Sequence, residues 1–147
     1  MSFTDRLKLK PLLPEIARLN AWLDAAIEGS GVRRSLGVDL KLCLNEVAIN
    51  LISYAFATAP EPFIDIEIVL DADVAKAKVR DNGAYFDIRT WPMPTPPDDI
   101  VDAQIGGYGI LLIRDRASSI AYERVGDVNC LTITCSAPGL DTGRQSP

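Results

Sequence analysis

The pattern of apolar and polar positions begins with alternation and passes into helical spacing. Residues Arg6 to Leu12 alternate polar and apolar side chains and predict a first strand. Apolar residues then recur at helical spacing from Ile16 to Ile27, after Pro14 at a position suited to a first helical turn, and a glycine-rich stretch from Gly29 ends this predicted helix. A second helix, predicted from Ser35 to Thr58, is apolar around most of its circumference, which indicates burial on more than one side.

The second half of the chain is predicted to form two hairpins with a helix between them. Phe63 to Leu70 and Val74 to Arg80 alternate and predict the first hairpin, and Ile120 to Val125 with Cys130 to Cys135 predict the second. The intervening helix is predicted from Ile110 to Ser119. Strands joined by tight turns pair antiparallel. The sequence therefore predicts an α+β fold: a two-layer sandwich of a mostly antiparallel mixed sheet with helices on one face.

Two segments stand outside these elements. Trp91 to Asp102 contains four prolines and three aspartates and is the only long irregular stretch. A loop of this length in a compact domain is usually a functional lid or is disordered, and we predict a mobile lid over residues 91–106. The length of 147 residues fits one domain, predicted over residues 1–137, and residues 138–147 are predicted to be a flexible tail.

Charge and composition narrow the classes of function. The formal net charge is −5, the sequence pI is about 4.7, and no stretch is rich in lysine or arginine. Direct nucleic-acid binding requires neutralisation of phosphates and is not expected. The longest apolar run, Gly109 to Ile113, is too short to span a bilayer. The sequence also has no polybasic patch that would bind a membrane surface. We expect a cytoplasmic protein.

The absence of histidine excludes several chemistries within this chain. With no histidine, a Ser-His-Asp hydrolase, a Cys-His protease, a histidine-ligated metal and histidine autophosphorylation are impossible here. The three cysteines, Cys43, Cys130 and Cys135, match no zinc spacing. We expect them to be small buried hydrophobic residues in a reducing compartment.

Three polar or glycine-rich clusters could carry chemistry. Glu46 and Asn50 lie one turn apart on the predicted second helix, about 6 Å along its axis, where a structural bridging role competes with a ligand-facing one. Asp81, with Gly83, follows a strand; it is either an ordinary turn or a carboxylate that accepts a hydrogen bond from an exocyclic amine. Residues 106–109 (GGYG) precede a helix, where exposed N–H groups suit a phosphate.

In this order the three clusters resemble the N, G1 and G2 boxes of the GHKL (Bergerat-fold) ATPases. The resemblance extends from about Leu7 to Thr134. Two strings, NEVAINLISYAF and GGYGILLIRDRASSIAYERVGDVNCLTI, most resemble the serine/threonine kinases that act as anti-sigma factors in bacteria. The resemblance implies a Bergerat fold that binds ATP and Mg²⁺. It also implies a kinase that phosphorylates a STAS-type antagonist and sequesters a sigma factor; such relatives are often homodimers.

The resemblance also implies a role for each site residue. Glu46 would be the general base, and Asn50 would hold the Mg²⁺ that bridges the phosphates. Asp81 would bind the adenine amino group, with Gly83 behind the ring. The remaining nucleotide contacts, chiefly from backbone to phosphate, would come from Gly107, Tyr108 and Gly109.

Two departures from the family pattern bear on activity. Tyr85 stands where many relatives have a second glycine, and no lysine or arginine lies between Arg89 and Arg114 to reach a γ-phosphate from the lid. Phosphoryl transfer depends on positioning and charge neutralisation, so a kinase that is weak, or completed by its partner, would fit these departures. A regulator that binds partners under nucleotide control, or without nucleotide, is the alternative; a third is the catalytic domain of a two-component kinase that acts on a separate phosphotransfer protein.

Overall fold

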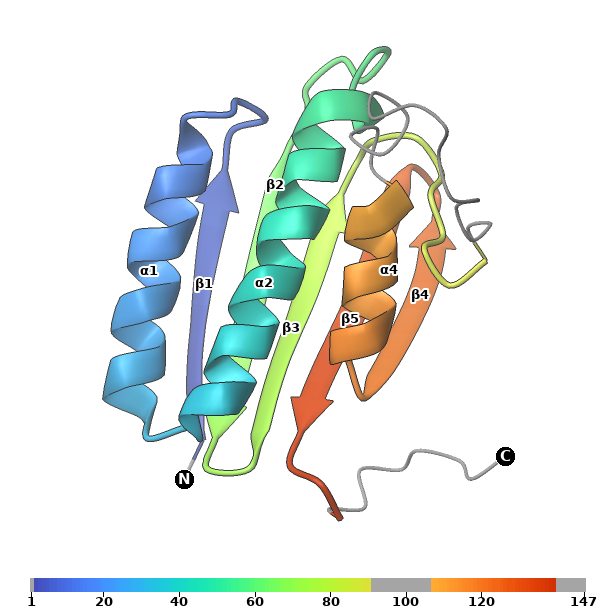
Figure 1. The fold of residues 1–147 in the computed structure, drawn as a ribbon. Coiled ribbons are helices and arrows are strands. Elements are labelled where there is room, and N and C mark those ends of the chain that lie inside the picture. Colours follow the sequence, from blue (N-terminus) through green and yellow to red (C-terminus); the bar gives the residue numbers. More distant parts are fainter. Residues whose placement is uncertain (1, 91–106, 140–147) are drawn as a thin grey trace.

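The chain forms a sheet with helices stacked on one side of it (Figure 1). The computed structural model describes residues 2–90 and 107–139, and the backbone alone for Gly107 and Tyr108. The elements in chain order are β1 (Phe3–Leu9), α1 (Glu15–Ser30), α2 (Arg34–Asn50), the π-helical turn η1 (Leu51–Ala55), β2 (Ile64–Asp71), β3 (Val74–Asp81), α4 (Gly107–Arg116), β4 (Ser119–Val125) and β5 (Val128–Ser136). The predicted order of helices and strands is confirmed.

The described sheet has the strand order β1-β2-β3-β5-β4, and every pairing is antiparallel. The predicted mixed sheet was wrong in this respect. The two hairpins form the β2–β3 and β4–β5 pairs. The other two pairs, β1–β2 and β3–β5, join strands that are separated by longer connections, and these strands also run in opposite directions. The register of β3 with β5 places Asp81 opposite Asn129, two polar residues on the face that the helices cover.

The two faces of the sheet differ in chemistry because side chains alternate along each strand. Ile64, Ile66 and Ile68 of β2 are fully buried under the helices, as the alternation predicts. On the opposite face, charges of opposite sign stand side by side across strands: Arg6 faces Glu67, with 2.9 Å between Arg6 Nε and Glu67 Oε2. The core therefore lies wholly between the sheet and the helices.

The helices pack through both small and polar residues. Gly31 ends α1 in the left-handed conformation (φ 76°), which glycine adopts without steric cost. A Cβ on Gly37 would lie 2.6 Å from Ile27 Cγ2, so glycine allows α2 to approach α1 closely. Asn20 and Asn45 exchange hydrogen bonds of 3.0 and 2.7 Å between the same two helices.

Several predicted boundaries were wrong. The first strand lies three residues earlier than predicted, at Phe3–Leu9, and ends before Pro11, which has no N–H to donate. The second helix is α-helical only to Asn50 and continues as the π-turn η1. The predicted helix extends further because apolar residues continue across the change from α-helical to π-helical geometry. Helix α4 begins at Gly107, not Ile110, and ends at Arg116.

Two sequence predictions lie outside the described residues. The predicted lid at residues 91–106 is one, and the greater part of the predicted tail, residues 140–147, is the other. In the parts of the chain that are described, no helix combines the length and apolarity needed to cross a membrane.

Candidate functional site

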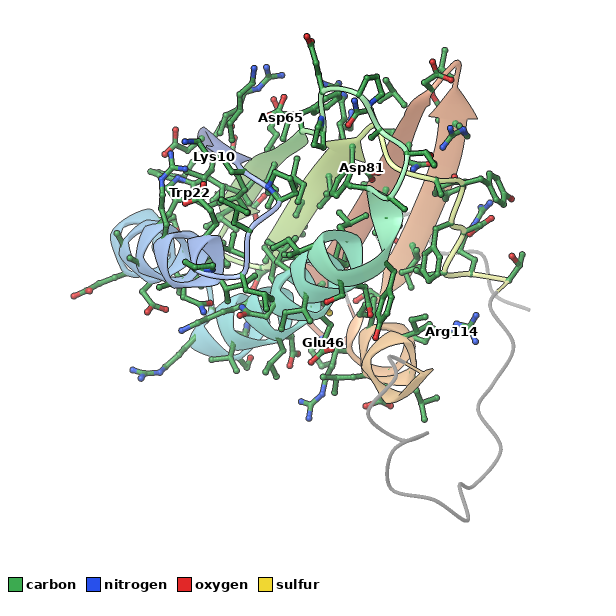
Figure 2. The ribbon with its side chains drawn as sticks, turned by 90° about the horizontal axis from the view of Figure 1, so that it is seen from above. Lys10, Trp22, Glu46, Asp65, Asp81 and Arg114 are labelled. Atoms are coloured by element: carbon green, nitrogen blue, oxygen red, sulfur yellow. The ribbon has the colours of Figure 1, made fainter. Side chains whose placement is uncertain are left out.

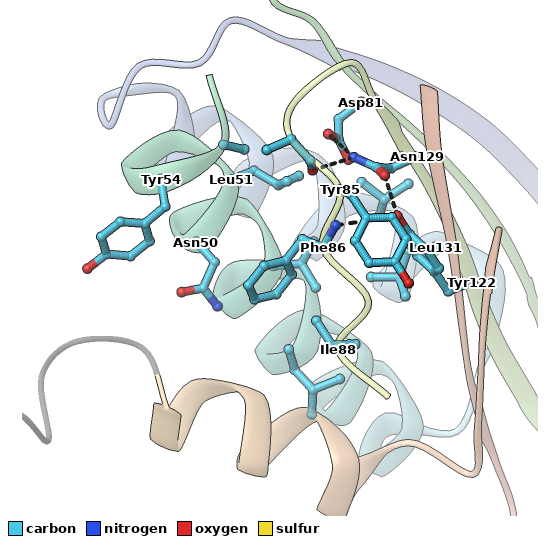
Figure 3. Close-up of a pocket in the computed structure, with 15 residues that line it drawn as sticks. Asn50, Leu51, Tyr54, Asp81, Tyr85, Phe86, Ile88, Tyr122, Asn129 and Leu131 are labelled. Atoms are coloured by element: carbon cyan, nitrogen blue, oxygen red, sulfur yellow. Dashed lines mark hydrogen bonds between the residues drawn. The ribbon is translucent and has the colours of Figure 1, made fainter. Parts of the chain in front are cut away.

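A pocket opens between the end of α2, the turn η1, and strands β3 and β5 (Figure 3). Most of its lining side chains are apolar, including Val47, Leu51 and Val79. The polar side chains that line it are Asn50, Asp81, Asn129, Tyr54, Tyr85 and Tyr122. An apolar pocket with a few fixed polar groups is the usual form of a small-ligand site.

Asp81 is the last residue of β3, and its carboxylate is held from one side. The residue is only 3% exposed, and its Oδ1 accepts hydrogen bonds from the Gly83 N–H (2.9 Å) and from Asn129 Nδ2 (3.0 Å). Burial raises the pKa of Asp81; the hydrogen bonds from Asn129 and Gly83 and the nearby Arg124 guanidinium oppose this rise. Oδ2 has no hydrogen-bond partner among the described residues, so it can accept a donor from a ligand.

The hairpin β4–β5 supplies a polar network that sequence reasoning missed. Asn129 Oδ1 accepts hydrogen bonds from the Tyr122 hydroxyl and from Arg124 Nη1, the latter at 2.9 Å. Asn129 Nδ2 donates to the Ala84 carbonyl (2.9 Å), and Arg124 Nη1 also donates to the Gly83 carbonyl (2.9 Å). The network fixes the turn after β3. The sequence contained a signal for this network, because Asn129 is a polar residue at an inward position of β5 where the other inward residues are apolar.

Gly83 is required by the packing of the protein itself. A Cβ at this position would lie 2.6 Å from Ala55 Cβ and 2.8 Å from the Ala55 carbonyl oxygen. The same carbonyl accepts a hydrogen bond of 2.9 Å from the Ala84 N–H. The space beside Gly83 is thus filled by the end of η1. The expectation that Gly83 lies behind the adenine ring of a bound nucleotide stays a prediction.

Glu46 and Asn50 both approach the start of α4. A Cβ on Gly109 would lie 2.3 Å from Glu46 Oε2, so the carboxylate rests against the first turn of α4, and Figure 2 shows Glu46 between α2 and α4. Asn50 Nδ2 is buried without a hydrogen-bond partner in the described structure. A buried orphan amide costs about 1–3 kcal/mol and is retained chiefly where a ligand can satisfy it.

The segment after the turn, residues 84–90, closes one side of the pocket. The buried Asp87 accepts hydrogen bonds from Arg89 Nη2 (2.8 Å) and Nε (3.0 Å), and this guanidinium lowers the pKa of Asp87. Arg114 of α4 donates to the Ile88 carbonyl (2.9 Å from Nε), which ties the helix to the segment. Tyr85 is 64% exposed and packs edge-to-face on Tyr122 with ring centroids 5.4 Å apart.

The structure places two of the predicted site residues in the lining of this pocket and a third beside them. Asp81 and Asn50 line it, and Glu46 lies one turn from Asn50 against Gly109. Gly107 and Tyr108 belong to the first turn of α4, where N–H groups without helical partners are available to an anion. The pocket has the Asp81 carboxylate at one end and the start of α4, where an anion can bind, at the other. This arrangement suits a ligand that carries both an amine and a phosphate.

Known sequences and structures place this arrangement in a family. The pattern of the histidine kinase-like ATPase domain matches residues 9–135. The chain belongs to this family, the GHKL ATPases, which confirms the class that its three boxes resemble.

Particular relatives are protein kinases by name. Serine/threonine-protein kinase BtrW of Bordetella bronchiseptica is 29% identical over 138 residues, covering 93% of this chain and 97% of the relative. Serine-protein kinase RsbW of Listeria monocytogenes is 31% identical over 114 residues, covering 75% of this chain and 71% of the relative. Both are distant homologues that are named as serine kinases.

A solved structure supports the fold. The histidine kinase domain of a blue-light-activated histidine kinase from Erythrobacter litoralis superposes with a TM-score of 0.52 at 12% identity. The match covers 84% of this chain, which spans 59% of the length of that one. At this identity the likeness establishes the histidine kinase-like ATPase fold alone.

Substitution of Gly83 by alanine should lower stability. The added Cβ meets backbone at Ala55, which cannot rotate away, so we expect a loss of about 1–3 kcal/mol in the free energy of unfolding. Urea denaturation would measure it. Gly29→Ala is the matched control, because nothing lies within 4 Å of its Cβ; there we expect a gain of about 0.5–1 kcal/mol. Equal stability of the Gly83 variant and the parent would contradict the packing role.

Proposed function

We propose that this chain is an ATP-dependent protein serine/threonine kinase of the anti-sigma-factor type. The observation that carries the proposal is the placement of the buried Asp81 carboxylate in an apolar pocket whose other side leads to Asn50, Glu46 and the first turn of α4. The kinase names of the two relatives described above support the same function.

The adenine end of the site would be formed by Asp81 and apolar walls. Oδ2 of Asp81 would accept a hydrogen bond from the exocyclic amine of adenine, while Val47, Leu51 and Leu131 would contact the flat faces or edges of the base. Because the pocket excludes water from these walls, a hydrogen bond made there gains strength.

The phosphate end would be formed by α4 and α2. The N–H groups of the first turn of α4, with the positive end of its dipole, suit the phosphates. Magnesium would neutralise phosphate charge when bound, and Asn50 would be its protein ligand through the amide oxygen. The unpartnered Nδ2 of the same amide is a donor and would suit a phosphate oxygen, not the metal. Mg²⁺ usually keeps several waters and takes few protein ligands, so one amide is sufficient here.

Glu46 would accept the proton of a serine hydroxyl on the partner as phosphoryl transfer proceeds. Its carboxylate is beside Gly109, hence beside the expected phosphates, and one helical turn from Asn50. The substrate would be a STAS-type antagonist, and the same chain would sequester a sigma factor, in some relatives as a homodimer.

A nucleotide-controlled binding regulator without kinase activity is the second candidate. It is favoured by the absence of any lysine or arginine between Arg89 and Arg114 in the sequence. These two arginines themselves bond Asp87 and the Ile88 carbonyl. Detection of ADP and of phosphate on a partner serine would separate the two candidates.

Substitution of Asp81 by asparagine should weaken ATP binding. The change replaces a carboxylate acceptor with an amide, and the loss of a hydrogen bond to a charged group corresponds to about a tenfold to hundredfold rise in Kd. Isothermal titration calorimetry with Mg-ATP would measure the change. Asn20→Ala, on the α1–α2 contact away from the pocket, is the control. Unchanged affinity in the Asp81 variant would show that the pocket is wrongly assigned.

Glu46→Gln and Asn50→Ala should affect different steps. Glu46→Gln should spare Mg-ATP affinity and slow phosphotransfer about a hundredfold to ten-thousandfold, because it removes a general base. Asn50→Ala should weaken Mg-ATP binding itself, since it removes the proposed metal ligand. Phosphotransfer to an antagonist, Mg-ATP affinity and the melting temperature should be measured for both. If both changes lower the melting temperature but leave transfer by the folded protein intact, the two residues are structural.

Substitution of Gly109 by alanine should separate stability from catalysis. The new methyl group displaces the flexible end of Glu46, and alanine favours a helix by about 1 kcal/mol over glycine, so the melting temperature should not fall. Phosphotransfer should fall because the carboxylate moves from its position. Transfer at the parental rate would argue against a catalytic position for Glu46 in this conformation.

A further inference from the structure

The structure gives Asn129 of β5 a specific relation to the pocket carboxylate. We propose that Asn129 is a positioning residue that fixes the orientation of Asp81, and that it thereby determines how the pocket distinguishes a 6-amino purine from a 6-oxo purine. The inference rests on the proposed function, since it takes the ligand of Asp81 to be a purine nucleotide.

The orientation of the Asn129 amide is determined by its neighbours. Arg124 can only donate hydrogen bonds, so the atom that it contacts at 2.9 Å must be the amide oxygen. The Tyr122 hydroxyl accepts from the Phe86 N–H at 3.4 Å and donates to the same amide oxygen. The amide nitrogen is consequently directed at Asp81 Oδ1 and the Ala84 carbonyl, at 3.0 and 2.9 Å.

This orientation makes the two oxygens of Asp81 unequal. Oδ1 receives N–H groups from both Gly83 and Asn129, at 2.9 and 3.0 Å, so it cannot readily take a proton. A proton that binds Asp81 is therefore directed to Oδ2, the oxygen left for the ligand. Ionised Asp81 offers an acceptor, which matches the amine of adenine. Protonated Asp81 offers a donor, which matches the carbonyl of a 6-oxo purine.

The surroundings of Asp81 make its ionisation dependent on Asn129. The charged group that faces it is Arg124, from β4, and Tyr122 lies behind Asn129. Among the described residues that line the pocket, α2, η1 and β5 contribute no charged side chain. Burial raises the pKa of Asp81, and the Asn129 amide is the largest influence opposing that rise. Removal of the amide should move the titration of Asp81 to higher pH.

A merely structural role for Asn129 predicts a different result. If Asn129 only supported the fold of the turn, its loss would weaken binding of every purine nucleotide by a similar factor at every pH. A positioning role instead predicts that the preference between two purines changes with pH. The ratio of the two affinities is the informative quantity, because the triphosphates of ATP and ITP titrate alike and cancel in it.

The test is the Kd of Mg-ATP and of Mg-ITP, measured by calorimetry over a series of pH values from mildly acidic to mildly alkaline. The parent should prefer ATP, and the preference should decline on acidification. In Asn129→Ala the decline should begin at a higher pH than in the parent, so that the preference for ATP at mildly acidic pH is several-fold smaller than in the parent. At the alkaline end the two preferences should agree within about threefold.

Three further variants make the outcomes distinct. Tyr122→Phe removes a hydroxyl that orients Asn129, so it should shift the profile in the same direction by less, and it carries the test if Asn129→Ala fails to fold. Asp81→Asn should remove the pH dependence of the preference. Asn20→Ala, which loses an amide pair between α1 and α2, should follow the parent.

The results that overturn the inference differ from those that overturn the proposed function. A parental profile in Asn129→Ala and Tyr122→Phe, or a loss of preference that is equal at every pH, refutes the positioning role alone. A parent that binds neither nucleotide refutes the nucleotide site and the inference with it. A parent that binds both equally at every pH keeps the nucleotide site and refutes the inference.

Discussion

The hydrogen bond between Asp81 and Asn129 joins two neighbouring strands on the face of the sheet that the helices cover. The two residues face each other across β3 and β5 and are each 3% exposed. A carboxylate buried among apolar side chains must be compensated, because an unpaired charge there costs several kcal/mol. The compensation draws in Tyr122 and Arg124 from β4. The turn at Gly83, the segment 84–90 and the end of η1 are then fixed in relation to one another.

The phosphate side of the pocket depends on a second constraint, the close approach of α2 and α4. Glycine at position 109 lets the Glu46 carboxylate rest against the first turn of α4. One turn from Glu46, the Asn50 amide nitrogen is buried and has no hydrogen-bond partner in the described structure. A fold that optimised stability alone would fill or pair this position. The site thus keeps a donor, an acceptor and a helix start in reach of one another at some cost in stability.

The sequence predicted the parts of this structure that depend on local pattern. Alternation at Ile64 and Ile66 located β2 and its buried face, and box spacing together with family resemblance located Asp81 and Glu46. The partner of Asp81 was missed because Asn129 lies 48 residues away, and only the register of β3 with β5 brings the two together. The π-turn was missed because apolar spacing changes little when one turn of a helix widens.

The pocket is assembled from four separated parts of the chain: residues 47–55, residues 79–88, Ile113 of α4, and residues 122–131. No local folding unit contains a complete binding site, so partial unfolding of any one layer abolishes it. A ligand that binds here consequently opposes each of these partial unfolding events as well as global unfolding. At a free ligand concentration one hundred times Kd, binding raises the free energy of unfolding by about 2.7 kcal/mol. Cellular nucleotide supply would then govern how long the folded chain survives proteolysis as well as whether its site is occupied.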